Sequence, residues 1–223
     1  APYFHKSKYG LPKVPIVAIK TFDFVGGMST EAERKELTYL FSQKFSRFSS
    51  LRNIVLEDGI NQTDISYDYL LEGTVRENAE NVVFDALLLD NVQDTVVWRY
   101  QKKYDLSNEE EKNWKEVSSS EVVSALASMH GIIDAFELKK HSDNTLENNE
   151  SYKCLLDYMA YDNNKTEEKH LIARTCLEKI VAHYPDYSLA WSYLTWIYGD
   201  EVRSGLNPRY DVETTKRMAL EAG

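Results

Sequence analysis

The sequence predicts an α+β protein in which an α/β sandwich is followed by an all-α helical segment. Up to residue 140, short β-branched runs alternate with stripes of apolar residues at helical spacing. From residue 151 on, the apolar period is helical throughout, and between the two parts residues 141–150 (HSDNTLENNE) are polar without any period. We therefore expect an N-terminal extension over 1–14, a sandwich domain over 15–140, a linker over 141–150 and a helical segment over 151–223.

The composition is that of a folded, acidic protein. The chain has 223 residues, of which 43% are hydrophobic, and its formal net charge is −10. Such a length supports a substantial core, whereas the acidic balance argues against nucleic-acid binding, which needs clustered Lys and Arg. No apolar run approaches the roughly 20 residues that span a bilayer. The first residues, APYFHKSKYGLPK, lack the apolar stretch of a signal peptide.

The first half of the sandwich is predicted from two apolar runs and the helix between them. Residues 16–22 (IVAIKTF) and 53–56 (NIVL) are short β-branched runs that are typical of buried strands. Thr30 and Glu33 have the spacing of a capping box, which starts a helix by satisfying its first backbone N–H groups. The helix that follows carries an apolar stripe made of Leu37, Leu40, Phe41, Phe45 and Phe48.

Three further strands are predicted over 67–75, 81–90 and 95–104. Their connections are short and polar, so we expect an antiparallel meander. The alternation puts one set of apolar side chains on a single face of each strand: Val82, Phe84, Ala86 and Leu88 in the middle strand, and Val96, Trp98 and Tyr100 in the last.

A long helix is predicted after the last strand. Ser107 and Glu110 have capping-box spacing, and the acidic run 109–111 suits a first helical turn because negative charge there complements the helix dipole. The stripe that would cover the sheet consists of Val122, Leu126, Met129, Ile133 and Phe136.

Four helices are predicted after the linker, over 152–161, 167–184, 189–198 and 211–222. Pro185 ends the second helix because proline cannot continue the backbone hydrogen bonds. Residues 199–208 are expected to form a loop.

Four stretches resemble the strand signatures of the TolB-like amino-terminal domain. They are PIVAIKTF (15–22), YLLEGTVREN (69–78), VVFDALLLDN (82–91) and VVWRYQKKYDL (96–106), in the order and spacing of that family. The chain departs from the family in a helix shortened to 60–66 and in a missing Gly-containing turn before the Trp strand. The resemblance covers 15–138 and implies a TolB-like α/β sandwich.

The helical segment resembles tetratricopeptide repeats, which are helix pairs with a period of about 34 residues. With Pro185 as the closing proline of one repeat, the packing positions of the family are held by Ala173, Leu177 and Ile180, and in the next repeat by Trp191, Leu194 and Tyr198. Roughly one and a half repeats are present, fewer than the three of a stable stack. We expect either a truncated array or one that the sandwich domain caps.

A TolB-like domain followed by tetratricopeptide-like helices resembles the arrangement in two groups of bacterial signalling proteins. One group is the CadC-type membrane transcription regulators, and the other is the class III adenylate cyclases. The resemblance implies a non-enzymatic sensory and protein-interaction region that contacts a protein partner or a second copy through its helical repeats, without nucleic acid, and reaches a membrane only through a segment outside this sequence. We expect the periplasmic side of a single-pass inner-membrane protein; the alternative is the cytoplasmic regulatory region of a cyclase.

Aromatic residues of the helical segment are candidates for a partner-binding groove. The candidates are Tyr158, Tyr161, Tyr193 and Trp196. Tyr193 and Trp196 fall between the packing positions of the repeat and could line a concave groove, where aromatic anchors often dominate peptide binding. The alternative is simple packing, since repeats bury most of their aromatic residues.

The turn after the first strand is a candidate anion site. Gly26, Gly27, Ser29 and Thr30 join a strand to the start of a helix, where backbone N–H groups can hold an anion. The alternative is an ordinary turn with an N-cap, because the motifs of phosphate-binding loops are absent. The histidines are isolated from one another, so no metal site is predicted. No nucleophile or phosphate motif is present, so no catalytic residue or cofactor is predicted either.

Cys154 and Cys176 are predicted to be free thiols. The repeat alignment places Cys154 opposite Ile180, four residues past Cys176. An axial offset of about 6 Å, added to a helix separation of about 8–10 Å, exceeds the roughly 7 Å between Cα atoms that a disulfide can bridge. A slip of the first helix by one turn would bring the two sulfur atoms into range.

Overall fold

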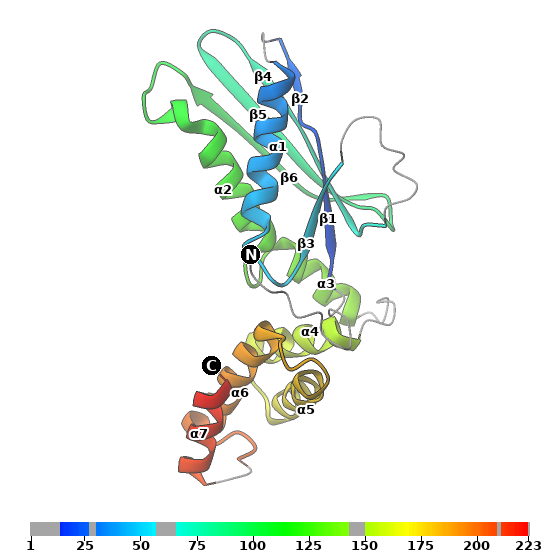
Figure 1. Ribbon diagram of the computed structural model, residues 1–223, viewed down its shortest axis with the longest axis vertical. Helices are drawn as coiled ribbons and strands as arrows, with labels where there is room; N and C mark the ends of the chain where they lie inside the picture. The colour runs from blue at the N-terminus through cyan, green and yellow to red at the C-terminus, as the bar shows by residue number, and fades with distance from the viewer. Residues whose placement is uncertain (1–13, 27–29, 57–65, 143–149, 209–210, 223) are drawn as a thin grey trace. The chain divides into compact units, whose positions relative to one another are not determined.

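The computed structural model describes residues 14–26, 30–56, 66–142, 150–208 and 211–222. They fall into two compact units (Figure 1): a sandwich unit, Pro15–Phe136, and a helical unit that comprises Val14 and the residues from Glu137 on. Residues 1–13 of the predicted extension and 143–149 of the predicted linker lie outside the described residues. The last helix of the sandwich region continues to Ser142, so the first two residues of the predicted linker are helical.

A mixed six-stranded sheet forms the centre of the sandwich unit. Its strands are β1 (Ile16–Lys20), β2 (Asp23–Val25), β3 (Arg52–Leu56), β4 (Tyr69–Glu77), β5 (Asn81–Asp90) and β6 (Thr95–Asp105). The strand order is β3-β1-β4-β5-β6, and β2 continues along β4 beyond β1. β1 runs parallel to β3 and β4, whereas β4, β5 and β6 form the predicted antiparallel meander.

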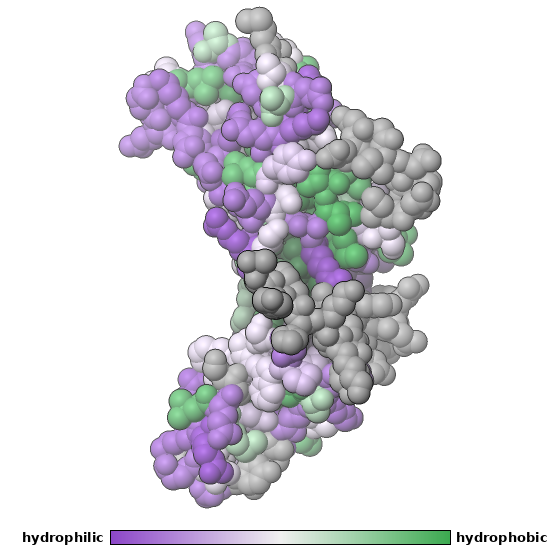
Figure 2. Space-filling model, viewed as in Figure 1, coloured by the Kyte–Doolittle hydropathy of each residue, from purple (hydrophilic) through white to green (hydrophobic). Residues whose placement is uncertain are grey.

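Two long helices, α1 (Glu31–Phe45) and α2 (Trp114–Ala127), pack against each other and cover one face of this sheet (Figure 1). The predicted capping box starts α1: the Thr30 side chain accepts from the Glu33 N–H, and the Glu33 carboxylate accepts from the Thr30 N–H. The outward faces of the two helices are mostly hydrophilic in Figure 2. The mixed α/β character predicted from the sequence is therefore confirmed.

The core lies between the sheet and these helices. The predicted shared face of β5 is confirmed, and this face is buried in the core, since its four apolar side chains are all fully buried: Val82, Phe84, Ala86 and Leu88. The ring of Phe22, just after β1, lies 4.8 Å from that of Phe41 in α1 and 5.5 Å from that of Phe84. Aromatic contacts of this kind join the sheet to α1.

The prediction that Val96 shares a strand face with Trp98 and Tyr100 is wrong. A β-bulge interrupts the β5–β6 register after the Leu88–Trp98 pair, so Val96 lies opposite Leu89, and its side chain is 54% exposed. Val97, the extra residue, packs against the core instead. One inserted residue reverses the face of everything beyond it, because side chains alternate with a period of two.

The predicted long helix is divided into three elements. A 3-10 turn, η2 (Glu111–Asn113), leads into α2, and α3 (Ile132–Ser142) follows after a break. His130 has a positive φ of 64° and the Gly131 N–H donates to the Ser128 carbonyl at 2.6 Å, which turns the chain between α2 and α3. Met129 lies in this turn and is 49% exposed rather than part of the apolar stripe.

The predicted capping box at Ser107 is also wrong. Its hydroxyl donates to the Asp105 carboxylate at 2.7 Å, and the Glu110 N–H donates to the side chain of Asn108. The Glu111 carboxylate accepts from the Asp105 N–H at 2.6 Å. The carboxylates of Asp105 and Glu111 therefore fix the turn between β6 and η2 and do not cap an α-helix.

The helical unit contains the four predicted helices, α4 (Glu150–Asn163), α5 (Glu167–His183), α6 (Ser188–Ser204) and α7 (Val212–Ala222). The predicted loop over 199–208 is wrong in its first half, since α6 continues through Gly199 to Ser204. Asp200 and Glu201 are buried, and their tertiary contacts hold these turns in helical form. The helix ends at Gly205, whose φ of 65° is the left-handed conformation that glycine adopts readily.

Substitution of Gly73 by Ala is expected to destabilise the sandwich unit by about 1–3 kcal/mol or more. A Cβ atom at residue 73 would lie 2.3 Å from the Asp85 carbonyl oxygen and 2.9 Å from the Phe22 ring, so the strand pair or the core must shift. Urea unfolding measures the loss. Gly199→Ala is the matched control, because no atom lies within 4 Å of its added Cβ and the change favours a helix. Equal stability of the two variants would contradict this prediction.

Candidate functional site

A polar cluster is buried around the last turns of α6. The Asp200 carboxylate accepts hydrogen bonds from the Tyr161 hydroxyl, the Lys165 ammonium and the Arg203 guanidinium, each at 2.7 Å. Burial alone would raise the pKa of the Asp200 carboxyl, but the hydrogen bonds from Lys165, Tyr161 and Arg203 outweigh it and hold the pKa below its ordinary value. Asp200 is thus an ionised anchor between α4, the α4–α5 connection and α6.

A buried ion pair lies beside it. The Arg174 guanidinium of α5 donates to the Glu201 carboxylate at 2.6 Å and to the Asn207 carbonyl at 2.7 Å. The two charged side chains are only 6% and 1% exposed. His170, also buried, has a ring nitrogen 3.2 Å from the Ile197 carbonyl, and burial lowers the pKa of its imidazole. Because these groups bind one another, the cluster fastens α5 to α6 and to the loop after it.

The predicted aromatic groove is not formed as expected. Tyr158, Tyr161 and Tyr193 are buried in the core of the helical unit, where the rings of Tyr158 and Tyr193 stack at 4.2 Å. This stacking joins α4 to α6, and none of the three tyrosines exposes more than 5% of its surface. Trp196 is the exception, at 56% exposure, with the Arg203 guanidinium 5.7 Å from its ring centre. It remains a candidate contact for a partner.

The candidate anion turn is only partly described. Gly26 has a φ of 86°, and Gly27 and Ser29 lie outside the described residues. The Thr30 N–H donates to the Glu33 carboxylate at 2.7 Å, and its hydroxyl lies 3.2 Å from the same oxygen. The Thr30 N–H is therefore already bound by the Glu33 carboxylate of its own capping box and is not open to another anion.

A cluster that sequence reasoning missed joins β6 to α2. The Glu121 carboxylate accepts from the Tyr100 hydroxyl at 2.5 Å and from the Lys102 ammonium at 2.7 Å, and the Tyr104 hydroxyl lies 3.1 Å from that of Tyr100. Burial, followed by the hydrogen bond to Glu121, raises the pKa of Tyr100. The alternation of Tyr100, Lys102 and Tyr104 on one strand face is a sequence signal, but their partner is 17 or more residues away in α2.

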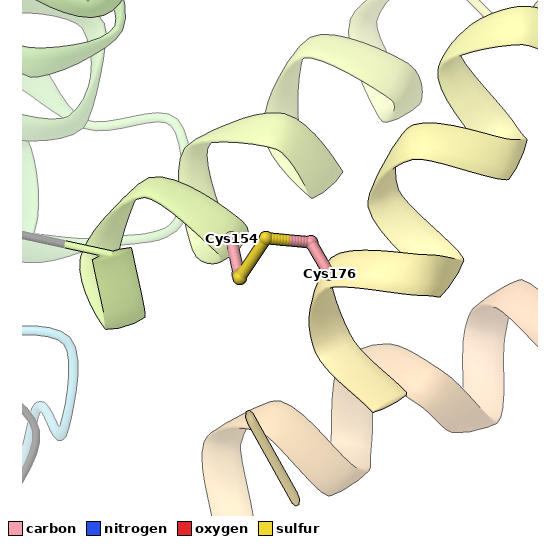
Figure 3. Close-up of a disulfide and its surroundings, with 2 residues drawn as sticks. All are labelled: Cys154 and Cys176. Atoms are coloured by element: carbon pink, nitrogen blue, oxygen red, sulfur yellow. A yellow bond between two sulfur atoms is a disulfide. The ribbon is translucent and has the colours of Figure 1, made fainter. Parts of the chain in front are cut away.

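The two cysteines form a disulfide, so the prediction of free thiols is wrong (Figure 3). Cys154 of α4 and Cys176 of α5 have Cα atoms 5.2 Å apart. Both cysteines lie 11 positions from Lys165, which is in the connection between the helices. A tight helical hairpin places equidistant residues at the same level. The repeat alignment, which set Cys154 against Ile180, is therefore wrong by one turn.

The described residues contain neither a metal-binding cluster nor a membrane-spanning helix. No group of three or more His, Cys, Asp and Glu side chains in them could hold a metal ion. None of their helices combines the length and the apolar character needed to cross a membrane. The side chain of His141 lies outside the described part.

Comparisons with known proteins find partial likenesses to solved structures. No protein-family model matches the chain, and no curated protein matches it. A PelC dodecamer from Paraburkholderia phytofirmans is similar over 51% of this chain and 90% of its own, with 15% identity and a TM-score of 0.41. TolB from Acinetobacter baumannii is similar over 50% of this chain and 27% of its own, with 14% identity and a TM-score of 0.36. Lipoprotein GNA1162 from Neisseria meningitidis is similar over 50% of this chain and 96% of its own, with 13% identity and a TM-score of 0.31.

Proposed function

We propose that the chain is a non-enzymatic sensory and protein-interaction region of a bacterial signalling protein and that it lies in an oxidising compartment, the periplasm. The observation that carries the proposal is the Cys154–Cys176 disulfide. Disulfides persist in secreted and periplasmic proteins, whereas cytosolic thiols are kept reduced. The disulfide therefore favours the sensor part of a CadC-type membrane regulator over the cytoplasmic regulatory region of an adenylate cyclase.

The packing of the helical unit supports a tetratricopeptide-like segment in this proposal. Each of its helices packs against the next, and α4 also contacts α6, which is the neighbour pattern of stacked helix pairs. Trp196 on α6 is the aromatic side chain we propose as a partner contact, because it is exposed while the neighbouring tyrosines are buried.

The sheet supports a TolB-like identity for the sandwich unit in the same proposal. The Leu-Glu-Gly-Thr-Val stretch on which the resemblance rests lies in β4, next to β1 and β2. Gly73 within it allows the Phe22 ring to approach the strand closely, since an added Cβ would lie 2.9 Å from that ring. This glycine therefore has a packing role that a chance match would not require.

A topology reporter tests the proposed compartment. In the full-length protein, in its host or a related bacterium, alkaline phosphatase and green fluorescent protein are each fused after residue 223. We expect phosphatase activity without fluorescence, because phosphatase needs the disulfides that form outside the cytoplasm. Each reporter is the control for the expression of the other. Fluorescence without phosphatase activity would place the region in the cytoplasm and support the cyclase alternative.

A further inference from the structure

The outer edge of β6 carries no partner strand in the described part of the chain. β6 is the last strand of the sheet and pairs with β5 on its other side. It spans eleven residues, whereas β3, at the opposite edge, spans five. A long unpaired edge offers a row of backbone N–H and C=O groups to an added strand.

One hydrogen bond fixes which residues of β6 face outward. The Leu106 N–H donates to the Glu80 carbonyl at 2.7 Å, which makes 106 and 80 a hydrogen-bonded antiparallel pair. Such pairs alternate with pairs that make no bonds to each other. In the regular register of β6, the backbone groups of Arg99, Gln101 and Lys103 therefore point away from β5 and toward the open edge.

The same three residues place polar side chains on the sheet face that α1 and α2 do not cover. They pair with Leu87, Asp85 and Val83, which alternate with the buried residues of β5. Arg99, Gln101 and Lys103 are all exposed. Neither Arg99 nor Lys103 forms a salt bridge with any residue that the structure describes, although the chain as a whole carries a net charge of −10.

The other face of the edge is aromatic. The rings of Trp98 and Tyr100 stack along β6 with centres 5.9 Å apart, and both side chains are half-buried. The hydrogen bond from Tyr100 to Glu121 holds this pair in place. A strand added at the edge would rest its apolar side chains on these rings.

We infer that the β6 edge binds an extended acidic segment of a partner protein by strand addition. Acidic side chains of that segment alternate with apolar ones, so that carboxylates lie beside Arg99 and Lys103 while apolar groups cover Trp98 and Tyr100. The inference rests on the proposed function as an interaction region and names the partner chemistry for it.

The charges of the edge also disfavour a second copy of this chain as the occupant. If two β6 strands paired about a two-fold axis, the Arg and Lys side chains of both copies would share one face within a few residues. Like charges on neighbouring strands destabilise pairing, and cations on an edge are a known protection against self-association. The carboxylates of an acidic strand would instead attract the cations of this edge.

Charge reversal at the edge is the first test. The probe is a labelled peptide of about ten residues with alternating Glu and Val, long enough to span a strand, and its fluorescence anisotropy is measured with the full chain. We expect binding that weakens as salt is added and that falls by about tenfold in the Arg99→Glu/Lys103→Glu variant. The same variant is expected to gain affinity for a peptide of alternating Lys and Val.

The matched control is Arg47→Glu/Lys179→Glu, which makes the same change in net charge at two exposed positions that are not part of β6. Unchanged binding of the acidic peptide by the edge variant, or an equal loss in the control, would overturn the inference. A dimer that the edge variant dissociates would overturn it in favour of a second copy.

Gln101→Pro tests the backbone part of the inference without changing charge. It removes an outward N–H that the β5–β6 ladder does not use, so we expect the fold to persist and the peptide affinity to fall by about tenfold. Gln101→Val keeps the N–H and is expected to retain binding. Peptide binding by the proline variant at the level of the parent would refute strand addition. The topology reporter is independent of these results, so the failure of this inference and that of the proposed function can be told apart.

Discussion

Replacement of Arg174 by Met is expected to lower the free energy of unfolding of the helical unit by about 3–5 kcal/mol. The change leaves the Glu201 carboxylate buried without its cation and removes the donor to the Asn207 carbonyl. One oxygen of Glu201, Oε2, already has no hydrogen-bond partner among the described residues, so the carboxylate has no alternative contact in place. Urea unfolding followed by circular dichroism at a helical wavelength measures the loss.

Two control variants separate the lost ion pair from the lost charge alone. Lys216→Met breaks the Lys216–Glu213 pair on α7, whose side chains are 53% and 83% exposed, and is expected to cost less than about 1 kcal/mol. Arg174→Met/Glu201→Leu removes both buried charges and is expected to recover much of the stability, because apolar groups of similar volume often replace a buried pair well. If Arg174→Met lowered the free energy of unfolding as little as Lys216→Met does, the buried pair would not be what holds α5 to α6.

Regular alternation is what made the strands predictable. β5 was predicted with the bounds that the structure has, 81–90, because its buried and half-buried residues alternate without interruption. The bulge at Val97 could not be predicted, since Val96, Val97 and Trp98 are all apolar and satisfy either alternation. Only the pairing with β5 decides which of them faces the core.

Helical periodicity was a weaker guide, because a stripe can continue across a break. The steps from Leu126 through Met129 to Ile133 fit one helix, yet the turn at His130 and Gly131 divides it. A glycine near the end of a helical pattern is a stop signal, and Gly131 was the residue that carried it. Gly199 led to the opposite error, because the contacts of the buried Asp200 and Glu201 keep this part of the chain inside α6.

The polar cluster around Asp200 and Glu201 lay beyond sequence reasoning for a different reason. Both are acidic residues in a stretch that reads as a loop, and their partners Tyr161 and Arg174 are 39 and 27 residues away. Burial of a charge depends on those partners and not on the local pattern. The aromatic groove was mispredicted for the same reason, because only the packing of α4 on α6 shows that the rings of Tyr158 and Tyr193 cover each other.

Removal of the disulfide is expected to destabilise the helical unit by about 3 kcal/mol. Cys154 and Cys176 are separated by 22 positions, and closing a loop of this size restricts the unfolded chain by roughly that free energy in the chain-entropy model. Cys154→Ser/Cys176→Ser is therefore expected to unfold at lower urea than the parent. The double variant avoids a single remaining thiol that could pair between molecules.

The reductant response provides the control for that comparison. Tris(2-carboxyethyl)phosphine is expected to shift the parent to the urea midpoint of the double Ser variant and to leave the variant itself unchanged. Thiol titration of unreduced, denatured protein gives an independent reading, with no reactive thiol expected because both cysteines are bonded. Two reactive thiols, with no effect of reductant on stability, would contradict the pairing of α4 with α5 and remove the observation on which the periplasmic proposal stands.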